Sequence, residues 1–133
     1  SDEVVNGRAQ SDVVIAAVTI DEEDKIVSIT IDTAQVRIAF DNEGQLVSDL
    51  NAALKTKAEL GDDYNMKARS DIGKEWYEQI EALEEWMIGK TISEVKAIQL
   101  ADGRPSGSDL VTSVTILVED YIKAVEKAVA NAK

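Results

Sequence analysis

The segment from Asp109 to Thr115 holds the side chains best suited to chemistry in this chain. Its three hydroxyl groups belong to Thr112, Ser113 and Thr115, and they follow Asp109 within one short stretch. The apolar pattern after the segment predicts a helix with Thr112 or Ser113 as its N-cap. A helix N-terminus offers unpaired N–H groups and the positive end of the helix dipole to an anion. The segment therefore predicts either a phosphate-binding loop or an aspartate turn with Ser/Thr capping, which uses the same atoms for structure.

The residues that most enzymes need are absent, because the chain has no histidine and no cysteine. It therefore lacks Ser-His and Cys-His triads, the usual near-neutral proton shuttle and thiolate ligands. The acidic turns Asp21–Asp24 and Asp62–Asp63 lack the alternating spacing and mid-loop glycine of a calcium-binding EF-hand. No pair of carboxylates stands out for glycoside hydrolysis. We expect no catalytic residue and no metal site.

The net charge of the chain indicates which binding partners are unfavourable. Asp and Glu number 26 against 14 Lys and Arg, which gives a formal net charge of -12. A surface this negative repels nucleic-acid phosphates and anionic lipid headgroups, so we expect neither nucleic-acid binding nor direct binding to a membrane surface. The basic side chains concentrate in one stretch, which suits either a small anionic ligand or the balance of nearby acids: Lys55, Lys57, Lys67, Arg69 and Lys74.

The first half of the chain has the pattern of an antiparallel sheet. With 133 residues and 44% apolar content, the sequence fits one domain, residues 13–133, after a polar, flexible lead-in over residues 1–12. Val13–Ile20 and Ile26–Ile31 are rich in Val, Ile and Thr and flank an acidic turn, which predicts a hairpin.

The acidic turn recurs twenty positions later, at Asp41–Gly44. It separates Val36–Phe40 from Gln45–Val47 and predicts a second hairpin. Two hairpins in succession form a small antiparallel β-meander.

Helical periodicity follows the predicted strands. Leu50, Leu54 and Ala58 can share one face of a short helix, and Thr91–Glu94 fits a capping box that opens another. Two longer apolar stripes predict a central helix, capped by Gly89, and a C-terminal helix: Ile72, Trp76, Ile80, Leu83 and Met87, then Val118, Tyr121, Ile122, Val125 and Val129. Strands followed by helices predict an α+β fold, with the sheet packed against these two helices.

The aromatic residues divide by their position on these stripes. Trp76 and Tyr121 lie on them, so we expect both in the core. Trp86 lies off the stripe, and we expect it to cover a strand or to meet a partner.

The segment Asp109–Thr115 is similar to the Asp-x-x-Ser-Gly-Ala-Thr motif of the bacterial FMN-binding domain family, in which the motif leads into an Ala- and Lys-rich last helix. Asp109, Thr112 and Thr115 fall on the pattern, whereas Ser113 replaces the Gly and Val114 replaces the Ala. The resemblance extends through the first hairpin and the central helix and covers most of residues 13–133.

The resemblance implies that Thr115 is the position that would be joined to FMN through a phosphoester. It also implies a domain of a redox chain at the outer face of the membrane, often part of a lipoprotein. Ser113 and Val114 add bulk where a phosphate would bind, and a β-branched Val resists left-handed backbone. These departures weigh against the attachment chemistry.

We therefore expect an exported, non-catalytic ligand-binding or scaffold domain with an FMN-binding-like fold. Asp109, Thr112, Ser113 and Thr115 are its predicted cofactor-binding residues. The alternative is an FMN-carrying electron-transfer domain of a cell-surface redox chain. Either would act outside the cell or at its surface, with attachment to the membrane or cell wall through a segment not in this chain.

Overall fold

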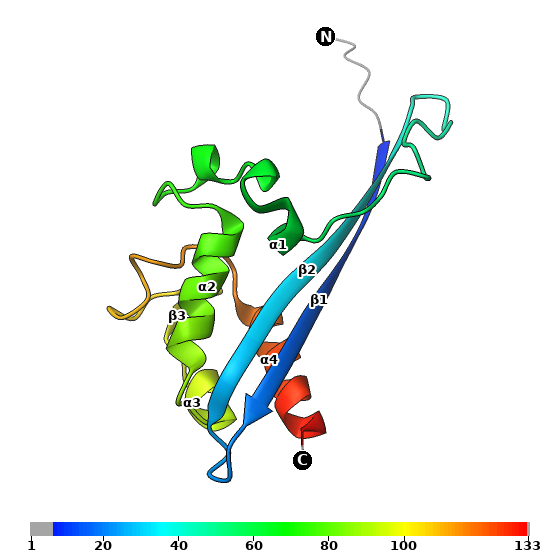
Figure 1. Ribbon diagram of the computed structural model, residues 1–133. Coiled ribbons are helices and arrows are strands. Elements are labelled where there is room, and N and C mark those ends of the chain that lie inside the picture. The colour runs from blue at the N-terminus through cyan, green and yellow to red at the C-terminus, as the bar shows by residue number, and fades with distance from the viewer. Residues whose placement is uncertain (1–6, 133) are drawn as a thin grey trace.

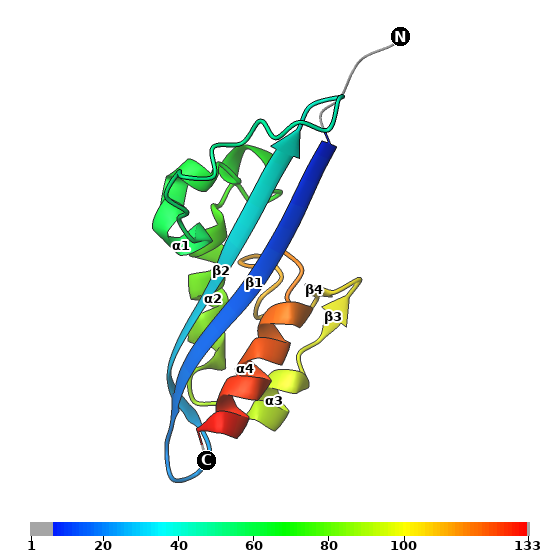
Figure 2. The same cartoon turned by 90° about the vertical axis from the view of Figure 1, so that its right-hand side faces the viewer.

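Two long strands form the frame of the computed structural model, which describes residues 7–132. Strands β1 (Gly7–Ile20) and β2 (Ile26–Phe40) pair antiparallel, with a register shift at Thr19/Ile20. Helix α2 (Trp76–Met87) packs against β2, and helix α4 (Glu119–Asn131) packs against β1 (Figure 1, Figure 2). The α+β class is confirmed, with an antiparallel hairpin packed against a central and a C-terminal helix.

The remaining elements are short and connect these four. Before α2 come helix α1 (Lys57–Leu60) and two 3₁₀ turns, η1 (Gly61–Tyr64) and η2 (Lys67–Arg69). After α2 come helix α3 (Ile92–Lys96) and a small hairpin of β3 (Leu100–Ala101) and β4 (Arg104–Pro105).

The core lies between one face of the β1–β2 hairpin and the helices. Alternate residues of each strand face inward because side chains alternate across a strand. Val14 lies opposite Thr33 and Ala16 opposite Ile31. The helices contribute the apolar stripes that the sequence predicts. The buried residues of these stripes are Trp76, Ile80, Leu83 and Met87 of α2, and Tyr121, Ile122, Val125 and Val129 of α4.

The two acidic turns use the same hydrogen bonds. The Asp21 Oδ1 atom accepts from the backbone N–H groups of Glu23 and Lys25, both at 2.9 Å. The Asp41 Oδ1 atom accepts in the same way from the N–H groups two and four positions later, at 2.9 and 2.8 Å. The fourth position of each turn has a positive φ, 60° at Asp24 and 79° at Gly44. The predicted repeat of turn chemistry is confirmed.

The second turn leads to a single bridge rather than a third strand. Phe40 and Leu46 form an isolated bridge, and the main sheet has two strands. The ladder ends there because Leu46 and Val47 are exposed and have no core face to bury. The second hairpin of the predicted meander is thus one residue pair deep.

Two further expectations are corrected. Residues 7–12 of the predicted lead-in belong to β1, because pairing with β2 satisfies their backbone groups although their side chains are exposed. Residues 1–6 lie outside the described residues. The helix expected over Leu50, Leu54 and Ala58 shrinks to α1, because Leu50 and Leu54 are 64% and 70% exposed.

Two of the three predicted helix ends are confirmed. Thr91 and Glu94 form the predicted capping box of α3, and Gly89 follows α2 with a φ of 80°. Helix α4, in contrast, has Val118 as its N-cap. Thr112 and Ser113 precede it in a separate turn, so the predicted cap was wrong.

The C-terminal half of α2 and the residues that follow it supply hydrogen-bond partners to β2. The Glu84 Oε2 atom accepts from the Ile31 N–H at 2.9 Å. Gly89 donates to the Ile26 carbonyl at 2.8 Å, and Ile26 donates to the Lys90 carbonyl at 2.9 Å. These contacts fix α2 against the strand and protect its edge.

We predict opposite outcomes for two substitutions of Glu84. Glu84→Ala should lower the free energy of unfolding by about 1–3 kcal/mol, because the buried Ile31 N–H loses its acceptor. Glu84→Gln keeps an acceptor. Burial raises the pKa of Glu84, while the bond from Ile31 acts in the other direction.

A raised carboxyl pKa means that the folded state binds the proton more tightly, so the contribution of Glu84 to stability falls as pH rises through the folded-state pKa. Glu84→Gln should therefore gain stability relative to the parent protein between pH 4 and pH 7. Urea unfolding across this pH range measures both effects. Equal stabilities of the two variants would show that the bond to Ile31 contributes nothing.

Candidate functional site

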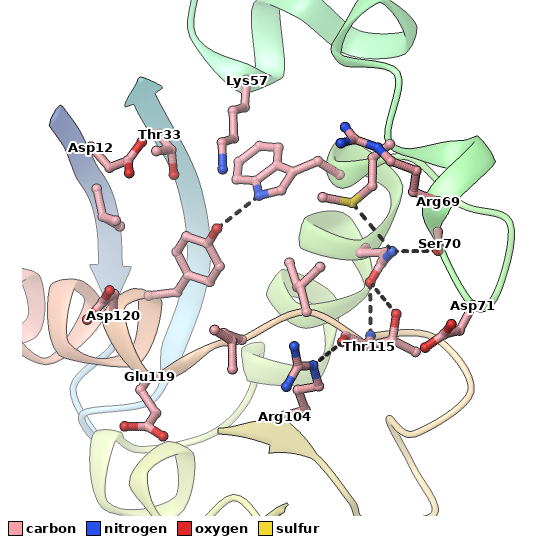
Figure 3. A pocket seen from close by; sticks show the side chains of 17 residues that line it. Asp12, Thr33, Lys57, Arg69, Ser70, Asp71, Arg104, Thr115, Glu119 and Asp120 are labelled. Atoms are coloured by element: carbon pink, nitrogen blue, oxygen red, sulfur yellow. Dashed lines mark hydrogen bonds between the residues drawn. The ribbon is translucent and has the colours of Figure 1, made fainter. Parts of the chain in front are cut away.

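A cavity of about 650 Å³, here called the main cavity, opens between the hairpin, the loops before α2 and the segment before α4 (Figure 3). Its volume lies within the range of small-molecule sites. Its lining residues come from distant parts of the chain and include Asp12, Thr33, Lys57, Arg69, Trp76, Gln79, Arg104, Thr115 and Tyr121.

Gln79 of α2 joins two walls of the main cavity. Its side chain is 0% exposed. Its Oε1 atom accepts from the Thr115 N–H at 2.9 Å and from the Thr115 Oγ1 hydroxyl at 3.3 Å. Its Nε2 group donates to Ser70 Oγ at 3.2 Å and to the Lys74 carbonyl at 3.3 Å. One buried carboxamide therefore fixes Thr115 against the loop that precedes α2 (Figure 3).

Glu75 fixes the other part of that loop. It is 3% exposed, and its carboxylate accepts from the N–H groups of Met66 at 2.8 Å and Lys67 at 3.0 Å. A buried carboxylate that accepts backbone N–H bonds in this way is well satisfied. The turn η2, which carries Arg69, is thereby held beside the cavity.

Trp76 and Tyr121 form a buried wall. Trp76 Nε1 donates to the Tyr121 hydroxyl at 2.9 Å, and the two rings meet edge to face with centroids 6.1 Å apart. The expectation that both lie in the core is confirmed. The Lys57 Nζ atom lies 5.6 Å from the Trp76 ring centroid and 5.0 Å from that of Tyr64, which places its charge against aromatic faces.

Thr33 of β2 is the unusual polar group of this wall. It is 2% exposed, and its Oγ1 atom has no hydrogen-bond partner among the described residues. Buried hydroxyls almost always have a partner. Thr33 lines the main cavity, so a molecule bound there would lie beside this residue.

Asp12 of β1, which pairs with Gln35 of β2, also lines the main cavity, and its pKa is lowered. The main cause is the hydrogen bond from Gln10 Nε2, at 3.0 Å. A bond from Gln35 adds to this effect, and the positive charges of Lys57 and Arg37 add less. The carboxylate therefore stays ionised at neutral pH.

A tight turn between β3 and β4 places Arg104 at the cavity. Asp102 and Gly103 both have positive φ, 50° and 78°, and the Gly103 carbonyl accepts from the N–H of Val118 at 3.0 Å. The positive φ of Gly103 favours glycine, and a Cβ atom there would lie 2.8 Å from a Glu119 carboxylate oxygen, so the Glu119 side chain would have to move. Arg104 Nε then donates to the Thr115 carbonyl at 3.1 Å.

The predicted site residues separate in the structure. Thr115 lines the main cavity. Asp109 lies at a different cavity, where its Oδ2 atom accepts from Trp86 Nε1 at 2.7 Å. Thr112 is exposed, and Ser113 is half-buried and donates its N–H to the Leu110 carbonyl at 2.8 Å. The segment thus combines one cavity residue with one structural anchor.

Trp86 finds its partners within the chain. Besides the bond to Asp109, the Lys90 Nζ atom lies 4.4 Å from its ring centroid, and the indole packs partly buried against the core. Its polar edge is therefore used to hold the segment that contains Thr115.

Two features of the structure bear on the predicted phosphate-binding motif. The helix N-terminus near the cavity begins after Val118 and carries Glu119 and Asp120 in its first turn, which disfavours an anion there. Neither Ser113 nor Val114 has a positive φ. Val114 is buried in the core, so neither replacement strains the backbone or fills the cavity.

The sequence did not single out Gln79, Thr33 or Arg104 as site residues. Gln79 follows Trp76 by three positions and so lies on the apolar stripe of α2, where a polar residue signals a buried hydrogen-bond network. Thr33 continues the inward face after Ile31. Arg104 gives no comparable signal, because its position depends on the turn at Gly103.

Comparison with known proteins gives one short match. The chain is 52% identical over 42 residues to a chlorophenol reductase of Desulfitobacterium hafniense, a match that covers 32% of this chain and 13% of that protein. No family model matches the sequence, and no solved structure matches it.

The described residues include neither a cluster of metal-ligating side chains nor a helix that could span a membrane. Among them, no group of three or more Asp or Glu side chains is placed to hold a metal ion. None of the helices within residues 7–132 is long and apolar enough to cross a membrane.

We predict that Gln79→Leu opens the main cavity and destabilises the fold. The free energy of unfolding should fall by about 1–3 kcal/mol, because the Thr115 N–H loses its buried acceptor. Hydrogen exchange should identify the site, with the Thr115 amide losing protection more than amides in the centre of α4. The exposed Gln45→Leu is the matched control. Unchanged protection of Thr115 would contradict the role assigned to Gln79.

Proposed function

We propose that this chain is a non-catalytic ligand-binding domain of an exported protein, and that a small organic ligand occupies the main cavity. The observation that carries the proposal is the buried, unpartnered Thr33 hydroxyl in the wall of that cavity. A ligand that accepts or donates one hydrogen bond at this point would satisfy it.

The surrounding groups fit a ligand with a polar or anionic part. Lys57, Arg69 and Arg104 line the main cavity, and the chain elsewhere is strongly acidic. Asp12, Asp71, Glu119 and Asp120 also line it. This mixture favours a ligand that carries hydrogen-bond donors as well as an anionic group.

The ionisation of the side chains that line the main cavity supports ligand binding rather than acid–base catalysis. Efficient proton transfer needs a group with a pKa near the working pH. The pKa of Asp12 is lowered instead. The carboxyl of Glu84 and the phenol of Tyr77 have raised pKa values, but neither lines the main cavity.

An FMN-carrying electron-transfer domain is the second candidate. The observation that favours it is the position of Thr115, which lies on the cavity wall with its hydroxyl fixed by Gln79 and its carbonyl bonded to Arg104. Thr115 would hold the phosphate, Arg104 would balance its charge, and Thr33 would bind a polar atom. FMN when bound would supply the redox chemistry. The short match to a chlorophenol reductase does not separate the two candidates.

We predict that FMN binds in the main cavity and that Thr33→Val weakens it. Titration of FMN and riboflavin, followed by fluorescence quenching, should give saturable binding of FMN. Loss of one hydrogen bond should reduce affinity by about two- to tenfold. Without ligand, Thr33→Val should be as stable as the parent protein or more so, because an unpartnered buried hydroxyl is removed.

Thr30→Val is the matched control, since Thr30 lies on the same strand with an exposed side chain. It should leave affinity unchanged. An absence of quenching by either flavin at high micromolar protein would reject flavin as the ligand. A marked loss of stability in Thr33→Val would show that its hydroxyl has a structural role.

Covalent attachment has a separate test. Expression of the protein together with a flavin transferase should give a yellow product whose intact mass exceeds that of the apoprotein by one FMN unit, if Thr115 carries the phosphoester. Thr115→Ala should abolish the added mass, whereas Thr112→Ala, at an exposed hydroxyl of the same segment, should retain it. A colourless parent protein at the apoprotein mass rejects the electron-transfer candidate in its covalent form.

A further inference from the structure

A second cavity of about 410 Å³, here called the basic cavity, adjoins the main cavity. The two share Lys57 and Arg69 in their walls. The basic cavity lies between the far end of β2, the connection before α1, and α1 with η1. Of the described residues that line it, four are basic and one is acidic: Arg37, Lys55, Lys57 and Arg69, with Asp63.

This charge balance is the reverse of that of the whole chain. The sequence has 26 acidic and 14 basic residues. A random selection of its ionisable residues would give mostly acids, yet this cavity gathers cations. Like charges brought together without counter-charges repel one another, so the arrangement is unfavourable in isolation.

None of the four cations forms an ion pair within the described residues, although the charges of Lys57 and Arg37 contribute to the lowered pKa of Asp12. The ion pairs within residues 7–132 join Lys25 to Glu23 and Lys96 to Glu126, which lie elsewhere. Arg37 Nε donates to the uncharged Gln10 Oε1 atom at 3.2 Å.

The other three cations likewise form no ion pair within the described residues. Lys57 lies against the rings of Tyr64 and Trp76. The side chains of Lys55 and Arg69 make no hydrogen bond or ion pair within the described residues. The donor groups of this cavity are therefore largely free to bind an anion.

We propose that the basic cavity binds a phosphate group, either as the free ion or as the phosphomonoester of a small organic molecule. Arg37 and Arg69 offer planar guanidinium groups that suit bidentate contact with phosphate oxygens. Lys55 and Lys57 add two point charges. The net charge of the lining suits a dianion better than a monovalent carboxylate.

The basic cavity is a more favourable place for the phosphate of a bound ligand than the segment before α4. The segment before α4 has Glu119 and Asp120 beside it, whereas the basic cavity has cations. Lys57 and Arg69 reach the wall of the main cavity (Figure 3). A ligand with its body in the main cavity can therefore place a phosphate in the basic cavity. The phosphate site does not depend on the proposed function, because inorganic phosphate alone can test it.

The test is a titration of the ¹⁵N-labelled full chain with sodium phosphate at constant ionic strength. We expect saturable chemical-shift changes at the amides of Ala53, Lys55, Lys57 and Tyr64. Arg37→Gln combined with Lys55→Gln should weaken binding about tenfold or more, since each removes a charge-assisted contact. Both residues are exposed, and circular dichroism verifies that the double variant is folded.

The matched control is Lys123→Gln combined with Lys127→Gln, which makes the same change in net charge on the exposed face of α4. It should bind phosphate like the parent protein. Shifts that stay linear and spread over the surface would identify an adventitious ion only and overturn the proposal. Equal weakening by the two double variants would also overturn it.

Flavin titration separates this site from the proposed function. If the phosphate of FMN occupies the basic cavity, the Arg37/Lys55 double variant weakens FMN and leaves riboflavin unchanged. Saturable phosphate binding without flavin binding would uphold the phosphate site and reject flavin as the ligand. Flavin binding without phosphate binding would do the reverse.

Discussion

The buried carboxamide of Gln79 is the interaction on which the candidate site depends. Its two ends hold Thr115 on one side and the loop at Ser70 and Lys74 on the other, and the residue is 0% exposed. Glu75, four positions earlier, holds the start of the same loop through two backbone N–H groups. Polar groups at such depth are costly unless satisfied, so once paired they fix a single geometry. The main cavity keeps its shape because both side chains project from one turn of a helix that the apolar core holds in place.

The hairpin forms the opposite wall of the main cavity, and its strand β2 also lines the basic cavity. Its strands extend beyond the helices, so the inward face changes along their length from core to cavity lining (Figure 2). Ile31 packs in the core, Thr33 lines the main cavity, and Gln35 lines the basic cavity. These residues are two positions apart, as strand alternation requires. One face of one strand therefore passes from stabilising the fold to lining two adjoining cavities.

Acidic and basic side chains also lie in different parts of the molecule. The acids dominate the turns and exposed helix surfaces, where water screens them, while unpaired cations collect at the basic cavity. A confined cluster of cations in a chain of negative net charge is compatible with a small anionic ligand. Selectivity of this kind depends on where charges lie rather than on their total.

The sequence by itself determined the class of the fold, because the periods of Val13–Ile20 and of the α2 and α4 stripes are local properties that packing preserves. It also determined the duplicated aspartate turns, whose hydrogen bonds span only four residues. Only the tertiary structure decided that Thr115 and Asp109 lie at different cavities, that residues 7–12 join the sheet, and that α4 begins after Val118. These outcomes rest on contacts between distant segments, such as Gln79 with Thr115 and Trp86 with Asp109, which no local pattern encodes.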